Sequence, residues 1–259
     1  MRLKELDVIS VLVFPILAAT VTVLVRTDLL VSVLMFFGLP ATYITLRNPG
    51  IFKKSLAFAF LVSIPLSLFV DTLAAINGSW IVPNSVFHFK IFGVATIEVY
   101  LFGLLWVLYT ILFYEHFFAG GQRGDRMSSH IIYFICLSIT LIAYVVVGFL
   151  FNNDLLYIPY FYAIVGIILV VIPLILFLAF YPFFWRRFLL VGVYFFFLLF
   201  LFEIAALATG QWMFPGIDFV DLVQIFGFRI PIEEVIIWML FATVSLLSYY
   251  EIFGDDRLL

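Results

Sequence analysis

The amino-acid sequence predicts an all-α integral membrane protein with about eight transmembrane helices. The 259 residues are 66% hydrophobic and only 11% charged, whereas soluble domains are usually about 45–50% apolar and about 25% charged. Apolar runs of about 20 residues, the length that crosses a bilayer as a helix, recur along the whole chain. One sequence pattern also occurs twice, which predicts two copies of one helical unit.

Each of eight segments is long and apolar enough to be a transmembrane helix. Arg2 and Lys4 precede the first one, as basic residues precede the apolar region of a signal peptide. Residues 8–25 exceed the length of about 7–15 residues that is usual for such a region, so they are predicted to form a transmembrane helix. The predicted helices cover residues 8–26, 28–46, 54–75, 94–117, 130–151, 155–181, 185–208 and 231–252.

The basic residues between these segments predict the orientation of the chain. Of the thirteen Lys and Arg residues, only Arg26, Lys90 and Arg229 fall on one side of the predicted membrane. Because cytoplasmic loops are enriched in Lys and Arg, both termini are predicted to be cytoplasmic. The expected location of this multi-pass protein is a prokaryotic cell membrane. The ten on the other side are Arg2, Lys4, Arg47, Lys53, Lys54, Arg123, Arg126, Arg186, Arg187 and Arg257.

An internal repeat is the most informative feature of the sequence. An acidic residue, Ala, Gly, Trp and Pro recur with identical spacing in Asp71, Ala74, Gly78, Trp80 and Pro83 and in Glu203, Ala206, Gly210, Trp212 and Pro215. Downstream, Thr96-Ile97-Glu98 corresponds to Pro231-Ile232-Glu233. The predicted organisation is a four-helix repeat in residues 1–118, a cytoplasmic loop in 119–129 and a second repeat in 130–259. Four helices per repeat make the two repeats parallel.

Five acidic residues of these motifs are expected at one depth, in the non-cytoplasmic half of the membrane: Asp71, Glu98, Glu203, Glu233 and Glu234. Carboxylates inside a membrane are costly and usually mark a functional site. The alternative is that they cap helix starts, where the helix dipole favours a negative charge, or form an ion pair, as Arg229 could with Glu233. Trp80 and Trp212 belong either to a binding site or to an interfacial aromatic belt.

The remaining composition limits the partners and cofactors. The net charge of −3 argues against a nucleic-acid partner. The histidines His88, His116 and His130 lack metal-ligand spacing, and the single cysteine, Cys136, cannot form a disulfide within the chain, so no metal site is expected. No glycine-rich nucleotide-binding fingerprint is found, and no cofactor is expected.

The repeated motifs resemble those of the integral-membrane carotenoid cyclases, the heterodimeric lycopene cyclases and their fused single-chain relatives. Glu203-x-x-Ala-x-x-x-Gly-x-Trp212, followed by Arg229-Ile-Pro231-Ile-Glu233-Glu234, carries the resemblance in the second half. The segment from Asp71 to Trp80 and the segment Thr96-Ile97-Glu98 are similar to the other half. In this first half, Thr96 stands in place of the proline of the family motif, and Val99 stands in place of its second glutamate. The resemblance covers most of the chain.

The resemblance implies an isomerase that closes the end groups of linear lycopene into ionone rings by acid catalysis, without a redox step. It implies Glu233 or Glu234 as the proton donor, its neighbour or Glu203 as the base, and Glu98 and Asp71 as first-half counterparts. The expected substrate contacts are Trp80, Trp212, Arg229 and Asn77. The implied partners are a lipophilic carotenoid, membrane lipid and, in addition, a second copy of the chain or other carotenoid enzymes.

Two other functions remain open at this level. Parallel repeats with acidic residues in the membrane also suit a proton-coupled or cation-coupled transporter. A conduction path, however, needs polar residues across the whole depth, and the predicted acidic residues cluster near one interface. The third possibility is a non-catalytic membrane partner of a carotenoid enzyme.

Overall fold

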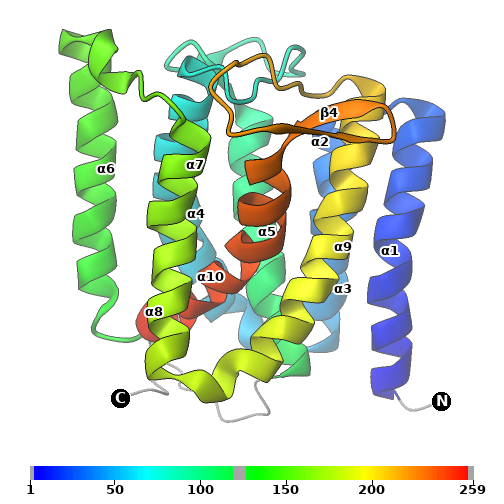
Figure 1. The fold of residues 1–259 in the computed structure, drawn as a ribbon. Helices are drawn as coiled ribbons and strands as arrows, with labels where there is room; N and C mark the ends of the chain where they lie inside the picture. Colours follow the sequence, from blue (N-terminus) through cyan, green and yellow to red (C-terminus); the bar gives the residue numbers. More distant parts are fainter. Residues whose placement is uncertain (1–2, 119–126, 256–259) are drawn as a thin grey trace.

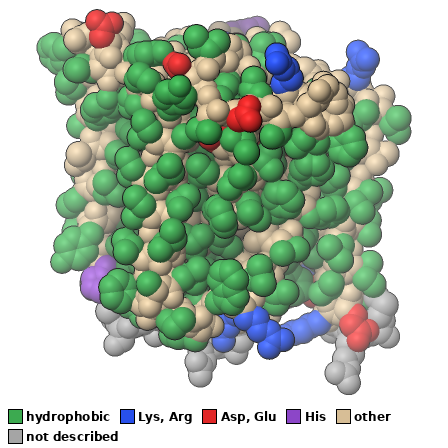
Figure 2. All heavy atoms as spheres, in the orientation of Figure 1, with side chains coloured by type: hydrophobic (Ala, Val, Ile, Leu, Met, Phe, Trp, Pro, Cys, Tyr) green, Lys and Arg blue, Asp and Glu red, His purple; other side chains and the backbone are tan. Residues whose placement is uncertain are grey.

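The computed structural model describes residues 3–118 and 127–255 and confirms the all-α membrane fold (Figure 1). Eight helices in these residues are long and apolar enough to cross a membrane. Most of their exposed side chains are apolar, and Figure 2 shows hydrophobic side chains over the middle of the molecule with charged ones towards its two ends. The spans are Lys4–Val25, Leu29–Arg47, Pro49–Ile76, Ile97–Phe117, Ile131–Phe151, Phe161–Phe180, Pro182–Thr209 and Glu234–Gly254.

Several spans combine α-helix with 3₁₀ or π segments (η), and two short antiparallel hairpins join spans. The first half contains α1 (Leu3–Val25), α2 (Leu29–Val33), η1 (Leu34–Gly38), α3 (Leu39–Arg47), η2 (Pro49–Ile51), α4 (Phe52–Ile76), β1 (Lys90–Ile91), β2 (Ala95–Thr96) and α5 (Ile97–Phe117). The second half contains α6 (Ile131–Phe151), η3 (Asn153–Leu156), α7 (Phe161–Gly166), η4 (Ile167–Val171), α8 (Ile172–Phe180), η5 (Pro182–Phe184), α9 (Trp185–Thr209), β3 (Leu222–Ile225), β4 (Phe228–Pro231), η6 (Glu234–Phe241), α10 (Ala242–Tyr249) and η7 (Tyr250–Gly254).

The eight spans alternate in direction, so the first and last helical segments reach the same side (Figure 1). We call the side where α1 begins and η7 ends the terminal face, and the side with both hairpins the hairpin face. Arg26, Lys90 and Arg229 lie at the hairpin face, as the sequence predicted. The basic residues Arg2, Arg123, Arg126 and Arg257, and most of the predicted loop 119–129, lie outside the described residues. That the terminal face is cytoplasmic stays a prediction.

The two halves share an unusual local geometry at the hairpin face. Gly78 and Gly210, which follow α4 and α9, adopt positive φ angles of 67° and 70°. Such angles suit glycine because it has no Cβ, so the recurrence of glycine in both motifs has a conformational reason. The hairpins also turn alike, since Phe92 and Phe226 both have φ of 50°. The same sequence pattern therefore produces the same helix end and the same hairpin in each half.

The hairpins correct the predicted starts of two helices. Residues 95–96 and 228–231 form strands, so α5 begins at Ile97 and the last span starts after Pro231. A third start is also wrong, because residues 155–160 precede the helix that begins at Phe161. Pro159 restricts the residue before it to extended conformations, and Tyr160 has a positive φ of 53°. Hydropathy does not detect these features.

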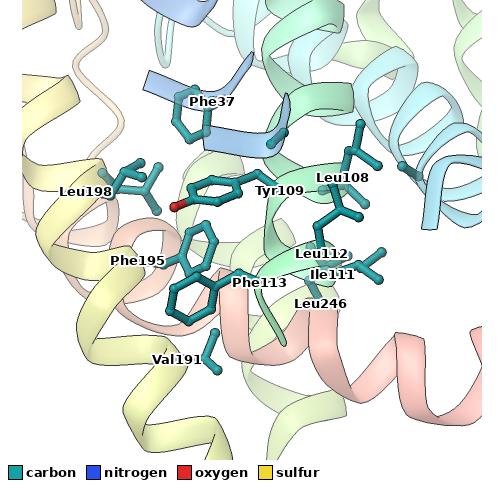
Figure 3. Packing of buried hydrophobic residues seen from close by; sticks show 14 of the residues in the cluster. Phe37, Leu108, Tyr109, Ile111, Leu112, Phe113, Val191, Phe195, Leu198 and Leu246 are labelled. Carbon is teal, nitrogen blue, oxygen red and sulfur yellow. The ribbon is translucent and has the colours of Figure 1, made fainter. Parts of the chain in front are cut away.

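Aromatic side chains fill the centre of the bundle between α5 and α9 (Figure 3). The rings of Phe113 and Tyr194 stack with their centroids 4.4 Å apart, and Phe195 packs edge-on against Phe113. The hydroxyl group of Tyr194 donates a hydrogen bond to the Val11 carbonyl at 2.9 Å and accepts one from Tyr109. This chain of hydroxyl groups satisfies polar atoms in the apolar interior and ties α1 to the central helices.

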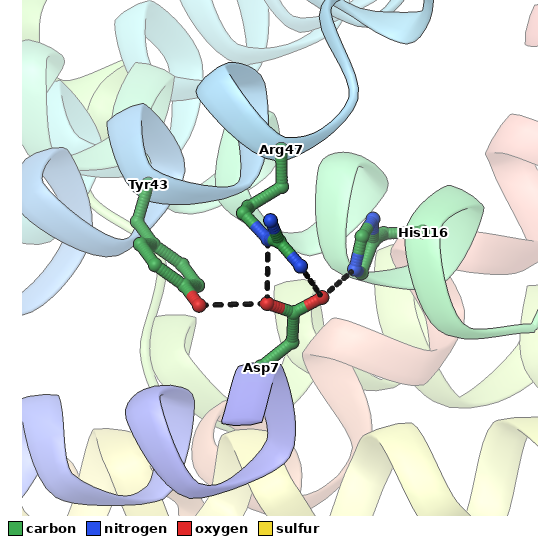
Figure 4. A network of polar contacts seen from close by, with 4 residues as sticks. All are labelled: Asp7, Tyr43, Arg47 and His116. Carbon is green, nitrogen blue, oxygen red and sulfur yellow. Dashed lines mark hydrogen bonds and ion pairs between the residues drawn. The ribbon is translucent and has the colours of Figure 1, made fainter. Parts of the chain in front are cut away.

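A partly buried ion pair fixes α1 at the terminal face (Figure 4). The Asp7 side chain is 3% exposed, and its carboxylate accepts hydrogen bonds from Arg47 Nε and Tyr43 Oη, both at 2.7 Å. His116 Nε2 lies 3.1 Å from the second oxygen. The three partners come from α3 and α5, so one carboxylate joins three spans.

The two halves meet directly at the hairpin face. Ile81 and Met213, at matching positions of the repeat, exchange backbone hydrogen bonds of 3.0 and 3.1 Å in an antiparallel bridge. Two equivalent residues that bond to each other in this way are related by a local two-fold axis. Nearby, Gly216 packs against the Gly78 carbonyl, since a Cβ atom at residue 216 would lie 2.7 Å from that oxygen.

Gly216→Ala is expected to lower the free energy of unfolding by about 1–3 kcal/mol, because the added methyl group overlaps backbone that cannot rotate away. The measurement is thermal unfolding in detergent. Gly38→Ala is the matched control, because its Cβ would meet Leu34 at an ordinary 3.5 Å. Equal melting temperatures for the two variants would contradict the close approach at Gly216.

Candidate functional site

A cavity of about 170 Å³ lies between α4, α5, α9 and the last span. Three of the acidic residues predicted from the repeat line it: Asp71, Glu203 and Glu234. The rest of its wall is largely aromatic and aliphatic, including Trp80, Phe102, Trp106, Tyr162, Phe202, Trp212, Phe214 and Trp238. The cavity therefore combines carboxyl groups with an oily environment inside the membrane region.

The repeat explains why Asp71 and Glu203 meet. They occupy matching positions near the ends of α4 and α9, which both run towards the hairpin face. The bridge between Ile81 and Met213 then holds the two following segments together. Trp80 and Trp212, one residue before the bridge in each half, pack edge to face with ring centroids 5.9 Å apart. Both tryptophans thus belong to the cavity rather than to a lipid-facing belt.

Glu203 is held by the tryptophan of its own motif. Its side chain is buried, and its Oε1 accepts a hydrogen bond from Trp212 Nε1 at 3.0 Å. The spacing of the motif explains this contact, because the chain turns at Gly210 and brings the Trp212 ring back to Glu203. Glu203 also interacts electrostatically with Glu234, so the two carboxyl groups act on one another.

Glu234 is positioned by residues outside the repeated motifs. Its carboxylate accepts a hydrogen bond from the hydroxyl group of Tyr162 on α7. The Tyr162 ring stacks on Trp238 with centroids 5.2 Å apart, and Trp238 Nε1 donates to the Tyr162 carbonyl at 3.3 Å. At the position that corresponds to Glu234, the first half has Val99. The site is therefore asymmetric, with one acidic residue from the first half and two from the second.

The other two predicted acidic residues do not line the cavity. Glu233 is 3% exposed, and its Oε1 accepts a hydrogen bond from the Val220 backbone N–H at 2.6 Å. Glu98 accepts hydrogen bonds from the Val86 N–H at 2.7 Å and from Ser85 Oγ at 2.8 Å. Both glutamates hold the loop before their hairpin, a structural role that differs from the helix capping considered from the sequence. Of the five acidic residues expected at one depth, three line the cavity.

Two expected substrate contacts also lie elsewhere. Asn77 links the end of α4 to the segment before α7. Its Nδ2 donates to the Leu156 carbonyl at 2.9 Å, and its Oδ1 accepts from the Ile158 N–H at 2.7 Å. Arg229 is exposed on β4 and forms no ion pair with Glu233 in the described structure. Asn77 organises the hairpin face, and both residues lie outside the cavity lining.

No family model matches the chain, and neither the curated proteins nor the solved structures contain a match. The functional argument therefore depends on the cavity itself. A carboxyl group that is removed from water favours its neutral form, and neighbouring carboxyl groups resist simultaneous ionisation. Such a site can donate a proton from one group and accept a proton at another.

Sequence reasoning missed Tyr162 and Trp238, which position Glu234. With aromatic residues making up 20% of the chain, no local pattern distinguishes these two from the many that pack or face lipid. The contact joins residues 72 positions apart, so it depends on how α7 packs against η6. Only the tertiary structure contains that information.

Buried carboxylates also occur at the terminal face, where the sequence did not predict a cluster. Asp7, Glu115, Glu251 and Asp255 are all buried there. Tyr250 Oη donates to Glu115 at 2.9 Å, and Lys54 pairs with Asp255 at 3.1 Å. Acidic residues are thus not confined to one interface. The clustering of the predicted acidic residues near one interface is therefore a weaker argument against a transporter.

Proposed function

We propose that this protein is a membrane carotenoid cyclase that closes the end groups of a linear carotenoid such as lycopene. The observation that carries the proposal is the convergence of Asp71, Glu203 and Glu234 from both repeats in one cavity with an aromatic wall. The resemblance of the repeated motifs to the carotenoid cyclases supports the substrate class. The oily surroundings suit a hydrocarbon substrate that is delivered by the membrane.

The proposed reaction begins with a proton transfer from one carboxyl group to the terminal double bond of the substrate. The resulting carbocation is attacked by a second double bond of the same chain, which forms the new carbon–carbon bond and closes a six-membered ring. A carboxylate then removes a proton from a neighbouring carbon and restores a double bond. One proton enters and one leaves, so the product is an isomer of the substrate and no electrons are exchanged.

The contacts of the three carboxyl groups assign a role to each. Glu203 and Glu234 form the interacting pair that supplies the acid and the base. Glu234 accepts a hydrogen bond from Tyr162, and Glu203 accepts one from Trp212. Asp71 lines the cavity from the first repeat. The faces of Trp80 and Phe202 offer π electrons that stabilise a cation without reacting with it.

The cavity size fits one end group at a time. A cavity of about 150 Å³ in another protein binds benzene, so about 170 Å³ accommodates a six-membered ring but not a whole carotenoid. The long remainder of the substrate would lie in lipid. The cavity-lining segments η4 and η6 also expose Ile167, Ile168 and Ile236 on the outer surface, so only one layer of helix separates the cavity from lipid.

Expression in a lycopene-producing bacterium tests the proposal. The expected result is conversion of the red linear pigment to products with cyclic end groups, identified by chromatography and absorption spectra. A parent chain that reaches the membrane but yields only lycopene, also when other carotenoid enzymes are co-expressed, would overturn the cyclase assignment. Proton leakage through proteoliposomes in that case would favour the transporter.

A further inference from the structure

Three buried hydroxyl groups in the middle of the bundle lack a hydrogen-bond partner within residues 3–118 and 127–255: those of Ser63, Thr110 and Ser245. Their residues are 2%, 0% and 1% exposed. Serine and threonine in helices commonly donate to the carbonyl four residues earlier, as Ser55 and Ser138 do at 2.9 and 2.8 Å. Buried hydroxyl groups rarely lack a hydrogen-bond partner, so we expect a further group to pair these three.

Two of these hydroxyl residues line the cavity at its inner end. Ser63, Ser67 and Asp71 are spaced four residues apart on α4 and therefore share one face of the helix. The helical rise of about 1.5 Å per residue places Ser63 about 12 Å from Asp71 along the axis, towards the terminal face. Ser67 lies between them and interacts with the Asp71 carboxyl group. Ser245 lines the same cavity from α10.

This polar row is specific to the first repeat. The spacing between Asp71 and Glu203 is 132 residues, and the same shift from Ser63 and Ser67 leads to Phe195 and Leu199. The row is therefore not a by-product of the shared fold. On α4, two small hydroxyl side chains take the place of the large apolar side chains that α9 has at the matching positions.

Further polar groups continue the row towards the terminal face. Thr110 lies about two turns from the end of α5, and Ser248 lies one turn beyond Ser245 on α10. Buried Glu115, which accepts a hydrogen bond from Tyr250, lies near the end of α5. In the opposite direction the cavity is bounded by Trp80, Trp212 and Phe214, which offer mostly apolar surface.

We propose that the inner end of the cavity binds a short chain of water molecules that connects Asp71 to the terminal face through Ser67, Ser63 and Ser245. A water molecule needs about 10–15 Å³ and 2–4 polar partners, and the cavity of about 170 Å³ with these hydroxyl groups provides both. Waters would pair the hydroxyl groups that have no partner in the described residues.

The role of this water chain rests on the proposed function. If different carboxyl groups act as acid and base, each turnover leaves the donor ionised and the base protonated. Because Glu203 and Glu234 line the same cavity as Asp71, a hydrogen-bonded route from that cavity to solvent returns both groups to their starting states without moving a net charge. The presence of water itself, however, is independent of cyclisation and is testable without substrate.

Cysteine accessibility in native membranes provides the test. Cys136→Ala removes the single cysteine, which is exposed on α6. Ser63→Cys and Ser245→Cys are then introduced one at a time, with Ser138→Cys as the matched control, because Ser138 is also buried but pairs with its own helix. Ag⁺, a small ion that needs an aqueous path, is added to membrane vesicles that expose either the terminal face or the hairpin face. The thiols that remain unmodified are then measured with a fluorescent maleimide.

The expected result is at least 10-fold faster modification of Ser63→Cys and Ser245→Cys than of Ser138→Cys when Ag⁺ is added at the terminal face. Rates equal to the control would overturn the proposal. Modification only from the hairpin face would also overturn it, because water would then enter from the other side. If either Ser63→Cys or Ser245→Cys is not produced, the modification rate of the other variant tests the proposal. Failure of the cyclase assay with successful labelling would reject the enzyme and keep the water route.

Discussion

Glu234→Gln and Glu203→Gln are each expected to reduce cyclic pigment formation about 100-fold or more, because a positioned acid or base contributes roughly that much to a proton-transfer step. Glutamine keeps the size of the side chain and can still accept the hydrogen bond from Tyr162 or Trp212. It cannot give a proton to an alkene or remove one from a carbocation. The measurement is the ratio of cyclic to linear carotenoid at matched membrane levels of each variant.

Glu233→Gln is the matched control for these two variants. Residue 233 adjoins Glu234 and undergoes the same chemical change, but its side chain accepts a hydrogen bond from the Val220 N–H and does not line the cavity. An amide oxygen can accept the same bond, so conversion should stay within a few-fold of the parent. Loss of activity in Glu233→Gln with normal activity in Glu234→Gln would reverse the assignment and place the chemistry outside the cavity.

Asp7→Asn is expected to lower the free energy of unfolding by about 1–2 kcal/mol, since the buried carboxylate loses charge-assisted hydrogen bonds while its partner Arg47, whose side chain is 32% exposed, is partly compensated by water. The new amide group would face Arg47 and His116 with its own N–H donors in place of a carboxylate oxygen. For a chain of this size the melting temperature should fall by roughly 2–8 °C. Thermal unfolding of purified protein in detergent measures the change.

Asp154→Asn provides the control for charge removal alone. Asp154 is exposed in η3, so the change in stability should stay within about 0.5 kcal/mol. If both Asp→Asn variants melt at the parent temperature, the contacts in Figure 4 do not stabilise α1 against the central helices.

The sequence predicted the membrane fold well because the bilayer imposes a simple physical requirement. Each span needs about 20 apolar residues with its backbone hydrogen bonds satisfied internally, and that requirement is visible in composition alone. The start of α5 and the start of the span at Phe161 were wrong for the same reason. Hairpins and turns such as Ala95–Thr96 are as apolar as the helices beside them, so hydropathy does not separate the two.

The sequence by itself determined the eight spans, the paired acidic and tryptophan motifs, and the set of acidic residues from which a site could be built. The tertiary structure alone decided which of them meet. Glu233 and Glu234 are neighbours in the chain but point to different sides at the start of the last span, so one reaches the loop at Val220 and the other reaches the cavity. Asp71 and Glu203 converge because the two halves bond to each other at Ile81 and Met213, a contact across 132 residues that no local pattern encodes.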